Sequence, residues 1–202
     1  MESVVISLKK NTDRRNTLKE KLEFGGITNY QIFDAIEECK EEDLPTPWKK
    51  DPRLKNDRKN QSRKCCYMSH LTVLKSLNAP SIILEDDIYF KKQDVIPISL
   101  SCLPEDAYMA FWDCTHIEEF DVNWCPVKSG GWVKIDTSKV RVWCAGCYWI
   151  KDPQEVYRTL CSRPSKVYDK CLIDYFQKEK PCYIWFAPSC FQDRESYISD
   201  IK

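Results

Sequence analysis

The sequence predicts an α/β fold in which helices cover both faces of a sheet. Residues 81–84, Ser-Ile-Ile-Leu, form a short apolar run with β-branched side chains, which is typical of a strand buried on both faces. Residues 3–33 have the pattern of a strand, a helix and a second strand, and strand and helix patterns continue to alternate after them. Hydrophobic residues make up 43% of the 202-residue chain, which is enough to bury a core of this kind.

The first three elements follow one another closely. A strand is expected at 3–8, and Asn11 or Thr12 can cap the helix that follows it. The glycines at 25 and 26 predict the end of that helix, since glycine is common just past a helix C-terminus. Residues 30–33 are short and rich in strand formers, and they complete a strand-helix-strand unit.

A long polar connection separates this unit from the next helix. Residues 37–60 are charged and contain three prolines, so a connection is expected there rather than a regular element. The apolar pattern over 65–77 then predicts a buried helix that leads into the strand at 81. Further strands are expected at 107–112, 123–127, 132–135, 140–150 and 182–187. One helix is expected to begin at Asp152 and another to cover 168–177. The tail over 188–202 is expected to be irregular.

The strand at 81–84 ends in three consecutive acids, Glu85, Asp86 and Asp87. In open α/β sheets ligands bind beyond the carboxyl ends of the strands. Three carboxylates gathered there repel one another unless solvent screens their charges or a basic group or a cation balances them. Mg²⁺ and Mn²⁺ take oxygen ligands and often bridge a carboxylate to substrate phosphates. The stretch therefore favours either a site for a metal and a diphosphate, or a solvated acidic turn.

The net charge and the lack of long apolar segments indicate which partners and which compartment to expect. The formal net charge is zero, so no global field favours nucleic acid or a membrane surface. The first residues lack the apolar core of a signal peptide, and no apolar run is long enough to span a bilayer. One domain over residues 1–202 in the cytoplasm is expected, with no nucleic-acid partner and no membrane span.

Twelve cysteines are many for a chain of this length. Without a secretory signal they are expected to be mostly reduced and buried as small hydrophobes. Cys144 and Cys147 have the spacing of a zinc half-site or a redox motif, although their surroundings are those of a buried strand. Cys114 and Cys125 could complete a zinc set, so a cysteine-based zinc or redox protein is one alternative.

Several segments occur in an order that resembles one enzyme family. They are Val5-Ile6-Ser7-Leu8 with Asp13-Arg14-Arg15, Phe33-Asp34-Ala35, Cys66-Tyr67-Met68-Ser69-His70, Ile83-Leu84-Glu85-Asp86-Asp87, Gly146-Cys147-Tyr148-Trp149-Ile150, Val167-Tyr168-Asp169-Lys170-Cys171-Leu172, and Pro188 with Gln192. This ordered set resembles glycosyltransferase family 25, which includes bacterial lipooligosaccharide galactosyltransferases and collagen β-galactosyltransferases. The resemblance extends over nearly the whole chain.

The resemblance implies a single GT-A-type, Rossmann-like α/β domain with a mixed, mostly parallel sheet. It further implies a hexosyltransferase that moves galactose or glucose from a UDP-sugar to a glycan or glycoprotein acceptor, with inversion and with Mn²⁺ or Mg²⁺. Such chemistry needs a cation at the leaving diphosphate and a carboxylate that deprotonates the acceptor hydroxyl. A non-catalytic module that binds nucleotide-sugar or carbohydrate within a larger assembly is the alternative.

In that scheme the acids at 85–87 have different roles. Asp87 is the expected direct metal ligand. Asp86 is expected as a second ligand or a ribose contact. Glu85 is expected to orient this pair or to pair with a base. It is also expected to belong to the residues that bind the donor.

Four more residues are expected to contact the donor. Arg14, near the start of the first helix, is the candidate for a phosphate or nucleotide-edge contact. The backbone of Ser7 and Leu8 is expected to flank the base. Gln192 is expected to close over the donor, or else to be an ordinary polar surface residue.

The catalytic candidates are His70, Asp169 and Asp174. His70 could hydrogen-bond the acidic cluster or touch the diphosphate. Asp169 is the candidate general base or acceptor-binding carboxylate. Asp174 is the weaker alternative, because its helical neighbours are apolar and it could simply cap or pair.

Overall fold

A computed structural model describes most of the chain. The described residues are 1–45, 58–113, 117–119, 131–143, 145–163, 168–185 and 190–192.

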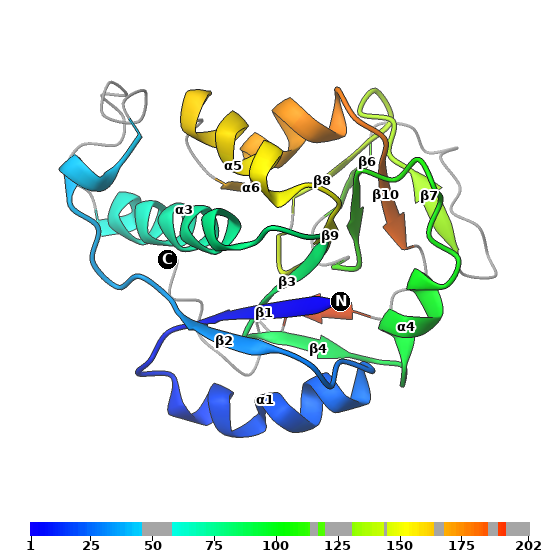
Figure 1. Cartoon of the computed structure of the whole chain (residues 1–202), viewed down its shortest axis with the longest axis horizontal. Helices are drawn as coiled ribbons and strands as arrows, with labels where there is room; N and C mark the ends of the chain where they lie inside the picture. The colour runs from blue at the N-terminus through cyan, green and yellow to red at the C-terminus, as the bar shows by residue number, and fades with distance from the viewer. Residues whose placement is uncertain are drawn as a thin grey trace.

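A seven-stranded sheet forms the centre of the described structure, in the order β2-β1-β3-β9-β5-β10-β7 (Figure 1). Its strands are β1 Glu2–Ser7, β2 Gln31–Asp34, β3 Ser81–Glu85, β5 Met109–Phe111, β7 Trp132–Lys134, β9 Cys147–Ile150 and β10 Cys182–Trp185. β9 runs antiparallel to both of its neighbours, and β7 runs antiparallel to β10, while the other neighbouring pairs are parallel. The predicted mixed, mostly parallel sheet is confirmed.

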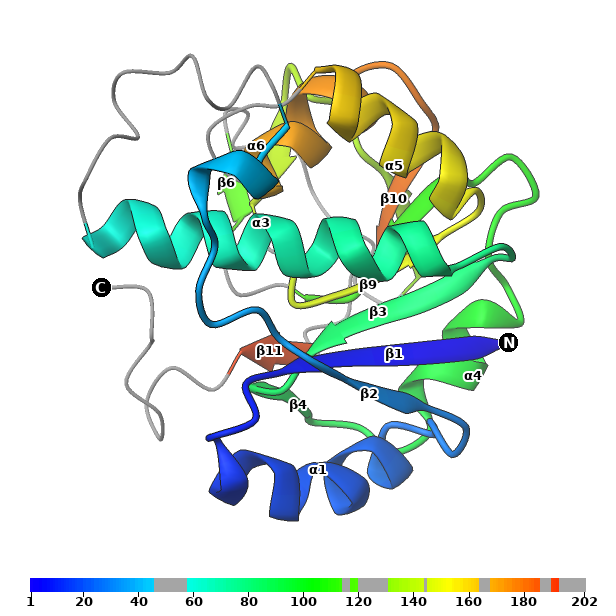
Figure 2. The same ribbon diagram turned by 60° about the vertical axis from the view of Figure 1, so that its left-hand side comes forward.

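Helices cover both faces of the sheet (Figures 1 and 2). α1 (Thr12–Phe24) lies on one side, where the short helix α4 (Val95–Leu100) joins the same core. α3 (Arg58–Ser76), α5 (Pro153–Ser162), α6 (Tyr168–Cys171) and the π-helix η3 (Leu172–Gln177) lie on the other. A short 3₁₀ turn, η1, spans Glu41–Asp43. The predicted α/β class is thus confirmed.

Two small sheets flank the main one. β4 (Ile88–Phe90) pairs antiparallel with β11 (Cys190–Gln192), and β6 (Ile117–Glu119) pairs antiparallel with β8 (Val140–Val142). β4 follows the acidic turn after β3, and β11 pairs with β4, so both strands border the edge of the sheet at which the acids lie.

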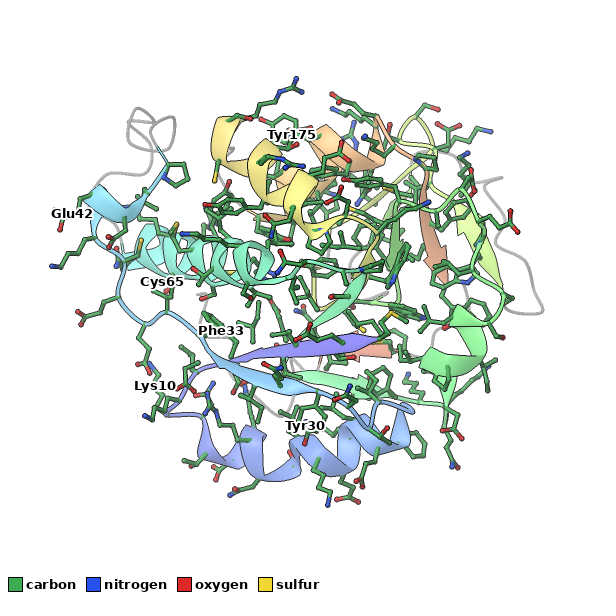
Figure 3. All side chains as sticks on the ribbon, in the orientation of Figure 1. Lys10, Tyr30, Phe33, Glu42, Cys65 and Tyr175 are labelled. Atoms are coloured by element: carbon green, nitrogen blue, oxygen red, sulfur yellow. The ribbon has the colours of Figure 1, made fainter. Side chains whose placement is uncertain are left out.

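Alternate residues of the central strands enter different cores, because successive side chains of a strand point to opposite faces. Ile83 of β3 packs in the core under α3, α5 and α6, whereas Ile82 and Leu84 pack in the core against α1. Side chains fill both spaces, with Phe33 on the α3 side and Tyr30 near α1 (Figure 3). This two-sided burial explains why β3 is a continuous apolar run rather than an alternating one.

Helix α1 ends as the glycine pair predicts. Gly25 is the C-cap, and Gly26 adopts φ 85°, a left-handed conformation that glycine takes without a steric cost. The amide of Ile27 then donates to the carbonyl of Leu22 at 2.8 Å, so the chain turns directly toward β2.

Several boundaries differ from those predicted. α3 begins at Arg58, inside the stretch expected to be a long connection, and the expected strand over 140–150 is two strands, β8 and β9. The second break has a visible cause, because the Gln177 side chain bonds both the amide and the carbonyl of Val142 and ends that segment outside the main sheet. The strand expected at 123–127 lies outside the described residues.

The tail expected to be irregular contains β11, and α4, β4 and β6 were not predicted either. β4, β6 and β11 are three-residue strands, so none is long enough to show a period of two in the sequence. The helix predicted over 168–177 has the predicted extent, but its second half is wound as a π-helix. Among the described helices, none is both long and apolar enough to cross a bilayer.

We expect the Asp152 cap of α5 to contribute measurably to stability. Asp152 Oδ1 accepts from the amide of Glu155 at 2.9 Å, with Pro153 at the first helical position. Asp152→Ala should lower the free energy of unfolding by about 1 kcal/mol, since it leaves a helix N-terminal amide without its partner. Urea unfolding measures the change. Asp152→Asn keeps a capping oxygen and should retain most of the stability, so equal losses in the two variants would contradict the capping role.

Candidate functional site

The acids that follow β3 lie where several chain segments converge. β3 ends at Glu85, Asp86 and Asp87 form the turn into β4, and the preceding strand β1 ends beside them at Ser7. β5 runs in the same direction as β3, with β9 between them, so its carboxyl end reaches the same edge of the sheet. Asp113 follows β5 there and is fully buried.

Asp86 is held from the α1 side of the sheet. Its Oδ2 accepts a hydrogen bond from Ser7 Oγ at 2.7 Å, and its Oδ1 accepts one from Arg14 Nη1 at 2.9 Å. All three residues are buried. The bonds join the ends of β1 and β3 to the first turn of α1, and the guanidinium of Arg14 balances the charge of Asp86.

A second arginine extends this network to β2. Arg15 donates from Nε to Ser7 Oγ at 3.0 Å and from Nη2 to the Ser7 carbonyl at 2.7 Å. Its Nη2 also donates to Asp34 Oδ1 at 2.7 Å. The carbonyl of Leu8 accepts from the amide of Asn11 at 3.0 Å, which turns the chain from β1 into α1. The backbone of Ser7 and Leu8, predicted to flank a base, is therefore fixed by its own network.

Asp87 is a partly buried acid with one carboxylate oxygen, Oδ1, that is itself buried and has no hydrogen-bond partner among the described residues. Burial, reinforced by the charge of Glu85 and more weakly by Asp86 and Asp113, raises the pKa of Asp87 to about 8, although Arg14 acts in the opposite direction. An orphaned carboxylate oxygen among further carboxylates fits a hard divalent cation, which prefers oxygen ligands.

Asp113 is a site residue that was not predicted: a strand was expected at 107–112, with no role for the acid that follows it. One signal was present: Asp113 is an acid directly after a buried apolar run, as the triplet at 85–87 is. The missing information was the strand order, because only the position of β5 beyond β9 shows that the two acidic ends share one edge.

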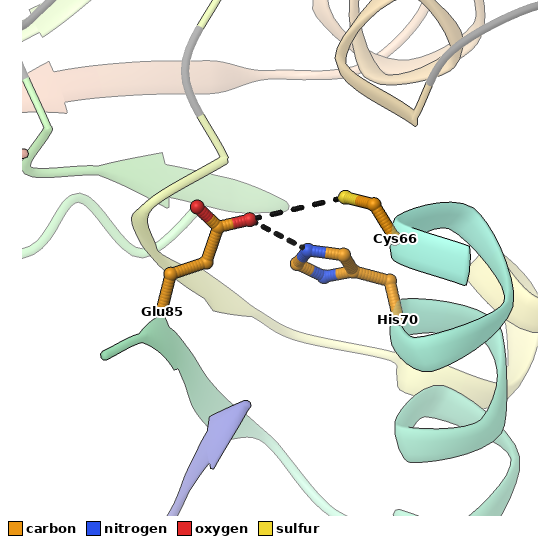
Figure 4. A group of neighbouring side chains, drawn as sticks. All are labelled: Cys66, His70 and Glu85. Carbon is orange, nitrogen blue, oxygen red and sulfur yellow. Dashed lines mark hydrogen bonds and ion pairs between the residues drawn. The ribbon is translucent and has the colours of Figure 1, made fainter. Parts of the chain in front are cut away.

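Glu85 is held from the opposite side, by α3 (Figure 4). Its Oε1 lies 3.3 Å from His70 Nε2 and 4.0 Å from Cys66 Sγ. Its Oε2 accepts from Gln192 Nε2 at 2.7 Å. His70 thus contacts the acidic cluster through Glu85, one of the two positions expected for it, and Gln192 is brought into the same cluster by β11.

Two buried tyrosines fix the ring of His70. His70 Nδ1 shares a hydrogen bond of 2.9 Å with Tyr148 Oη, and Tyr148 Oη shares one of 2.7 Å with Tyr168 Oη. The ring of Tyr168 stacks on the imidazole with centroids 4.0 Å apart. Burial raises the pKa of both phenols well above their ordinary value, so they remain neutral hydrogen-bonding groups.

Asp169 and Asp174 have different surroundings. Asp169 follows Tyr168 on α6, and its charge, after burial and Glu85, contributes to raising the pKa of the Cys66 thiol. Asp169 therefore lies on the side of the cluster that contains Cys66. Asp174 is paired with Lys170 and Lys178, each at 2.9 Å.

The two lysines dominate the ionisation of Asp174. Burial acts to raise its pKa, but the hydrogen bonds from both lysines outweigh burial and lower it. Each carboxylate oxygen of Asp174 faces one lysine. These are the contacts of the pairing alternative for Asp174.

The described cysteines are free thiols, and most of them are buried as small apolar side chains: Cys39, Cys65, Cys147, Cys171, Cys182 and Cys190. Cys147 is fully buried in β9. Its proposed zinc partner Cys144, as well as Cys114, Cys125 and Pro188, lies outside the described residues.

We expect Gly146 to be required for the packing of the acidic edge. A Cβ at this position would collide with Asp113 Oδ2 and lie 2.8 Å from Ile88 Cδ1 and 3.1 Å from Gln192 Cγ. Gly146→Ala should therefore cost about 1–3 kcal/mol in unfolding free energy and displace these neighbours. Chemical denaturation measures the loss. Gly131→Ala is the matched control, since no atom of the described residues lies within 4 Å of a Cβ placed there, and equal effects in both variants would refute this account.

Comparison with known proteins places the chain in a family. A family model described as glycosyltransferase family 25 (LPS biosynthesis protein) matches residues 1–123. A protein of Acanthamoeba polyphaga mimivirus, which bears the name of a glycosyltransferase, is 35% identical over 102 residues. That match covers 45% of this chain and 30% of the viral protein, so the chain spans less than a third of its relative.

Two solved structures share a distant likeness in shape. One is a glycosyltransferase involved in the glycosylation of the major capsid of PBCV-1, with a TM-score of 0.45 and 9% identity over 91% of this chain and 80% of that one. The other is 4-diphosphocytidyl-2C-methyl-D-erythritol synthase from Anaerococcus prevotii, with a TM-score of 0.44 and 9% identity over 100% and 94%. These likenesses are too distant to carry an argument. The family model, in contrast, matches well over half of the sequence and includes the acids at the end of β3, and the chain belongs to glycosyltransferase family 25.

Proposed function

We propose that this chain is a metal-dependent hexosyltransferase. It would transfer galactose or glucose from a UDP-sugar to a glycan or glycoprotein acceptor, with inversion at the anomeric carbon. The observation that carries the proposal is the buried Oδ1 of Asp87, which has no hydrogen-bond partner in the described part of the chain and lies among the charges of Glu85, Asp86 and Asp113.

Mn²⁺ or Mg²⁺ would be held by Asp87, with Asp86 and Asp113 as the neighbouring carboxylates. Asp86 can take part although Ser7 and Arg14 each bond one of its oxygens, because a carboxylate has about four lone-pair sites. When bound, the cation supplies charge neutralisation at the leaving diphosphate. The residues of the chain give it a fixed, oxygen-rich position at the end of a buried strand.

Arg14 would bind the donor phosphates from α1, in addition to the cation held by Asp87. Its guanidinium has five N–H donors, and the bond to Asp86 fixes its direction near the first turn of α1. A helix N-terminus favours anions, because its first amides lack partners within the helix. The side chain of Gln192, fixed on Glu85, would cover the donor from β11.

Asp169 would act as the general base. It lies on the side of the cluster that contains Cys66, whereas Asp174 is engaged by two lysines at 2.9 Å. His70 would position Glu85 rather than exchange a proton with substrate, because its imidazole is fully buried between Tyr148, Tyr168 and Glu85.

Donor binding is tested by thermal unfolding. UDP with Mn²⁺ at about 100 times the dissociation constant adds about 2.7 kcal/mol of stability, which corresponds to several degrees in Tm for a chain of this size. Asp87→Asn should abolish that rise, because it removes the charge that holds the cation. Asp136→Asn alters an exposed carboxylate near β8 and should keep the rise. A wild-type Tm that no nucleoside diphosphate changes would count against the proposal.

The division of roles within the acids can be checked in the same assay. Glu85→Gln keeps a side chain of the same shape that can still bond Gln192, so the Tm rise should be reduced rather than lost. If Glu85→Gln is as damaging as Asp87→Asn, Glu85 is itself a direct ligand and the proposed roles are wrong.

Catalysis is tested first by donor hydrolysis across a panel of nucleotide-sugars with Mn²⁺, because this reaction requires no knowledge of the acceptor. With an acceptor identified, Asp169→Asn should lower the transfer rate by about 10²–10⁴-fold while the Tm rise with UDP and Mn²⁺ persists. Asp174→Asn is the matched control and should leave the rate within a few-fold. Donor binding without hydrolysis or transfer would instead support a non-catalytic binding module.

A further inference from the structure

Cys66, His70 and Glu85 form a cluster that differs in chemistry from the oxygen-rich acids beside it (Figure 4). One ligand atom from each, namely Sγ, Nε2 and Oε1, lies within 4.8 Å of the other two. Cys66 and His70 are four residues apart on α3, so both side chains occupy one face of that helix.

His70 and Glu85 each have a second hydrogen-bond partner, and this partner leaves the proposed ligand atom directed into the cluster. Tyr148 bonds Nδ1 of His70, and Nε2 is thereby turned toward Glu85. Gln192 bonds Oε2 of Glu85, and Oε1 is thereby turned toward Cys66 and His70. Such outer partners orient the ligands in metal sites, where they fix the tautomer of the histidine and the direction of the carboxylate.

The cluster is also reachable from solvent. His70 is fully buried, but the side chain of Glu85 is 25% exposed and Cys66 is only partly buried. In a metal-bound cluster the ion would enter past these two side chains, and water would take one coordination position.

The identity of the ligand atoms selects the ion. Thiolate and imidazole favour zinc and related transition metals, whereas Mg²⁺ and Mn²⁺ favour the oxygens of Asp86, Asp87 and Asp113. A tetrahedral zinc site with bonds of about 2.0–2.3 Å separates its ligands by roughly 3.3–3.8 Å. The widest separation in the cluster, at most 4.8 Å, needs to shorten by about 1.0–1.5 Å to reach that geometry, while Oε1 already lies 3.3 Å from Nε2.

We propose that Cys66, His70 and Glu85 form a second metal site, which binds one Zn²⁺ independently of the cation at Asp87. Binding displaces the thiol proton of Cys66 to solvent, and the charges of thiolate and carboxylate balance that of the ion. The ion would join α3 to the end of β3, and through Gln192 it would strengthen the attachment of β11.

Cobalt substitution tests the site in the whole chain. Co²⁺ bound to a thiolate gives a charge-transfer band in the near ultraviolet, and tetrahedral Co²⁺ gives visible bands. We expect both to saturate at one equivalent in the wild type and to disappear when Zn²⁺, which binds more tightly, is added. Cys66→Ser should remove the charge-transfer band and weaken Zn²⁺ binding by at least the 10–100-fold typical of losing an outer partner.

Three variants make the assignment specific. Cys102→Ser, an exposed thiol on a different segment, should keep the cobalt spectrum. Asp87→Asn should keep it too while losing the response to UDP and Mn²⁺, which separates this site from the proposed donor site. Glu85→Gln should retain the thiolate band but weaken Zn²⁺ binding. Urea unfolding of each variant confirms that it is folded.

Two outcomes would overturn the proposal. One is a wild-type protein without a thiolate–cobalt band. The other is a band that survives in Cys66→Ser but is lost in Cys144→Ser, which would assign the metal to the Cys144 and Cys147 pair. Neither outcome depends on whether the chain responds to UDP, so the zinc site and the transferase function fail or stand separately.

Discussion

The buried ion pair between Arg14 and Asp86 is the interaction on which the arrangement at the sheet edge depends. It joins the first turn of α1 to the end of β3, and Ser7 completes it from β1. Removing one partner of a buried pair typically costs about 3–5 kcal/mol, because an uncompensated charge is left behind. Because Arg14 balances the charge of Asp86, Asp87 is the acid whose Oδ1 has no partner among the described residues. In the proposed site, the pair therefore leaves Asp87 as the main position for the cation.

Two adjacent acids, the last residue of β3 and the first residue of the turn after it, lie in chemically different surroundings. Asp86 turns toward α1 and meets a guanidinium, while Glu85 turns toward α3 and meets an imidazole and a thiol. Adjacent acids in the sequence thus enter different environments on opposite faces of the sheet. One environment consists mainly of oxygen atoms and the other contains nitrogen and sulfur. This difference is the basis for proposing two neighbouring sites that prefer different metals.

Much of this arrangement could be predicted from local sequence, and the failures share a physical cause. The strand expected at 81–84, the helix end at the glycine pair and the helix start at Asp152 depend on short-range patterns, and each agrees with the structure to within a residue or two. Asp113 and β11 were missed because their positions depend on which strands are neighbours, and the chain order does not contain that information. The split of the expected strand over 140–150 likewise depends on a distant side chain, that of Gln177.

The contact between Gln192 and Glu85 has a consequence for how the chain acquires its site. The two residues are 107 positions apart in the sequence, and the strand that carries Gln192 is only three residues long. Contacts of such separation close large loops, so they form late and slowly in folding. β1, β2 and β3 are synthesised well before β11, so Glu85 is in place before Gln192 can reach its Oε2. The contact with β11 is therefore among the last contacts to complete the described site.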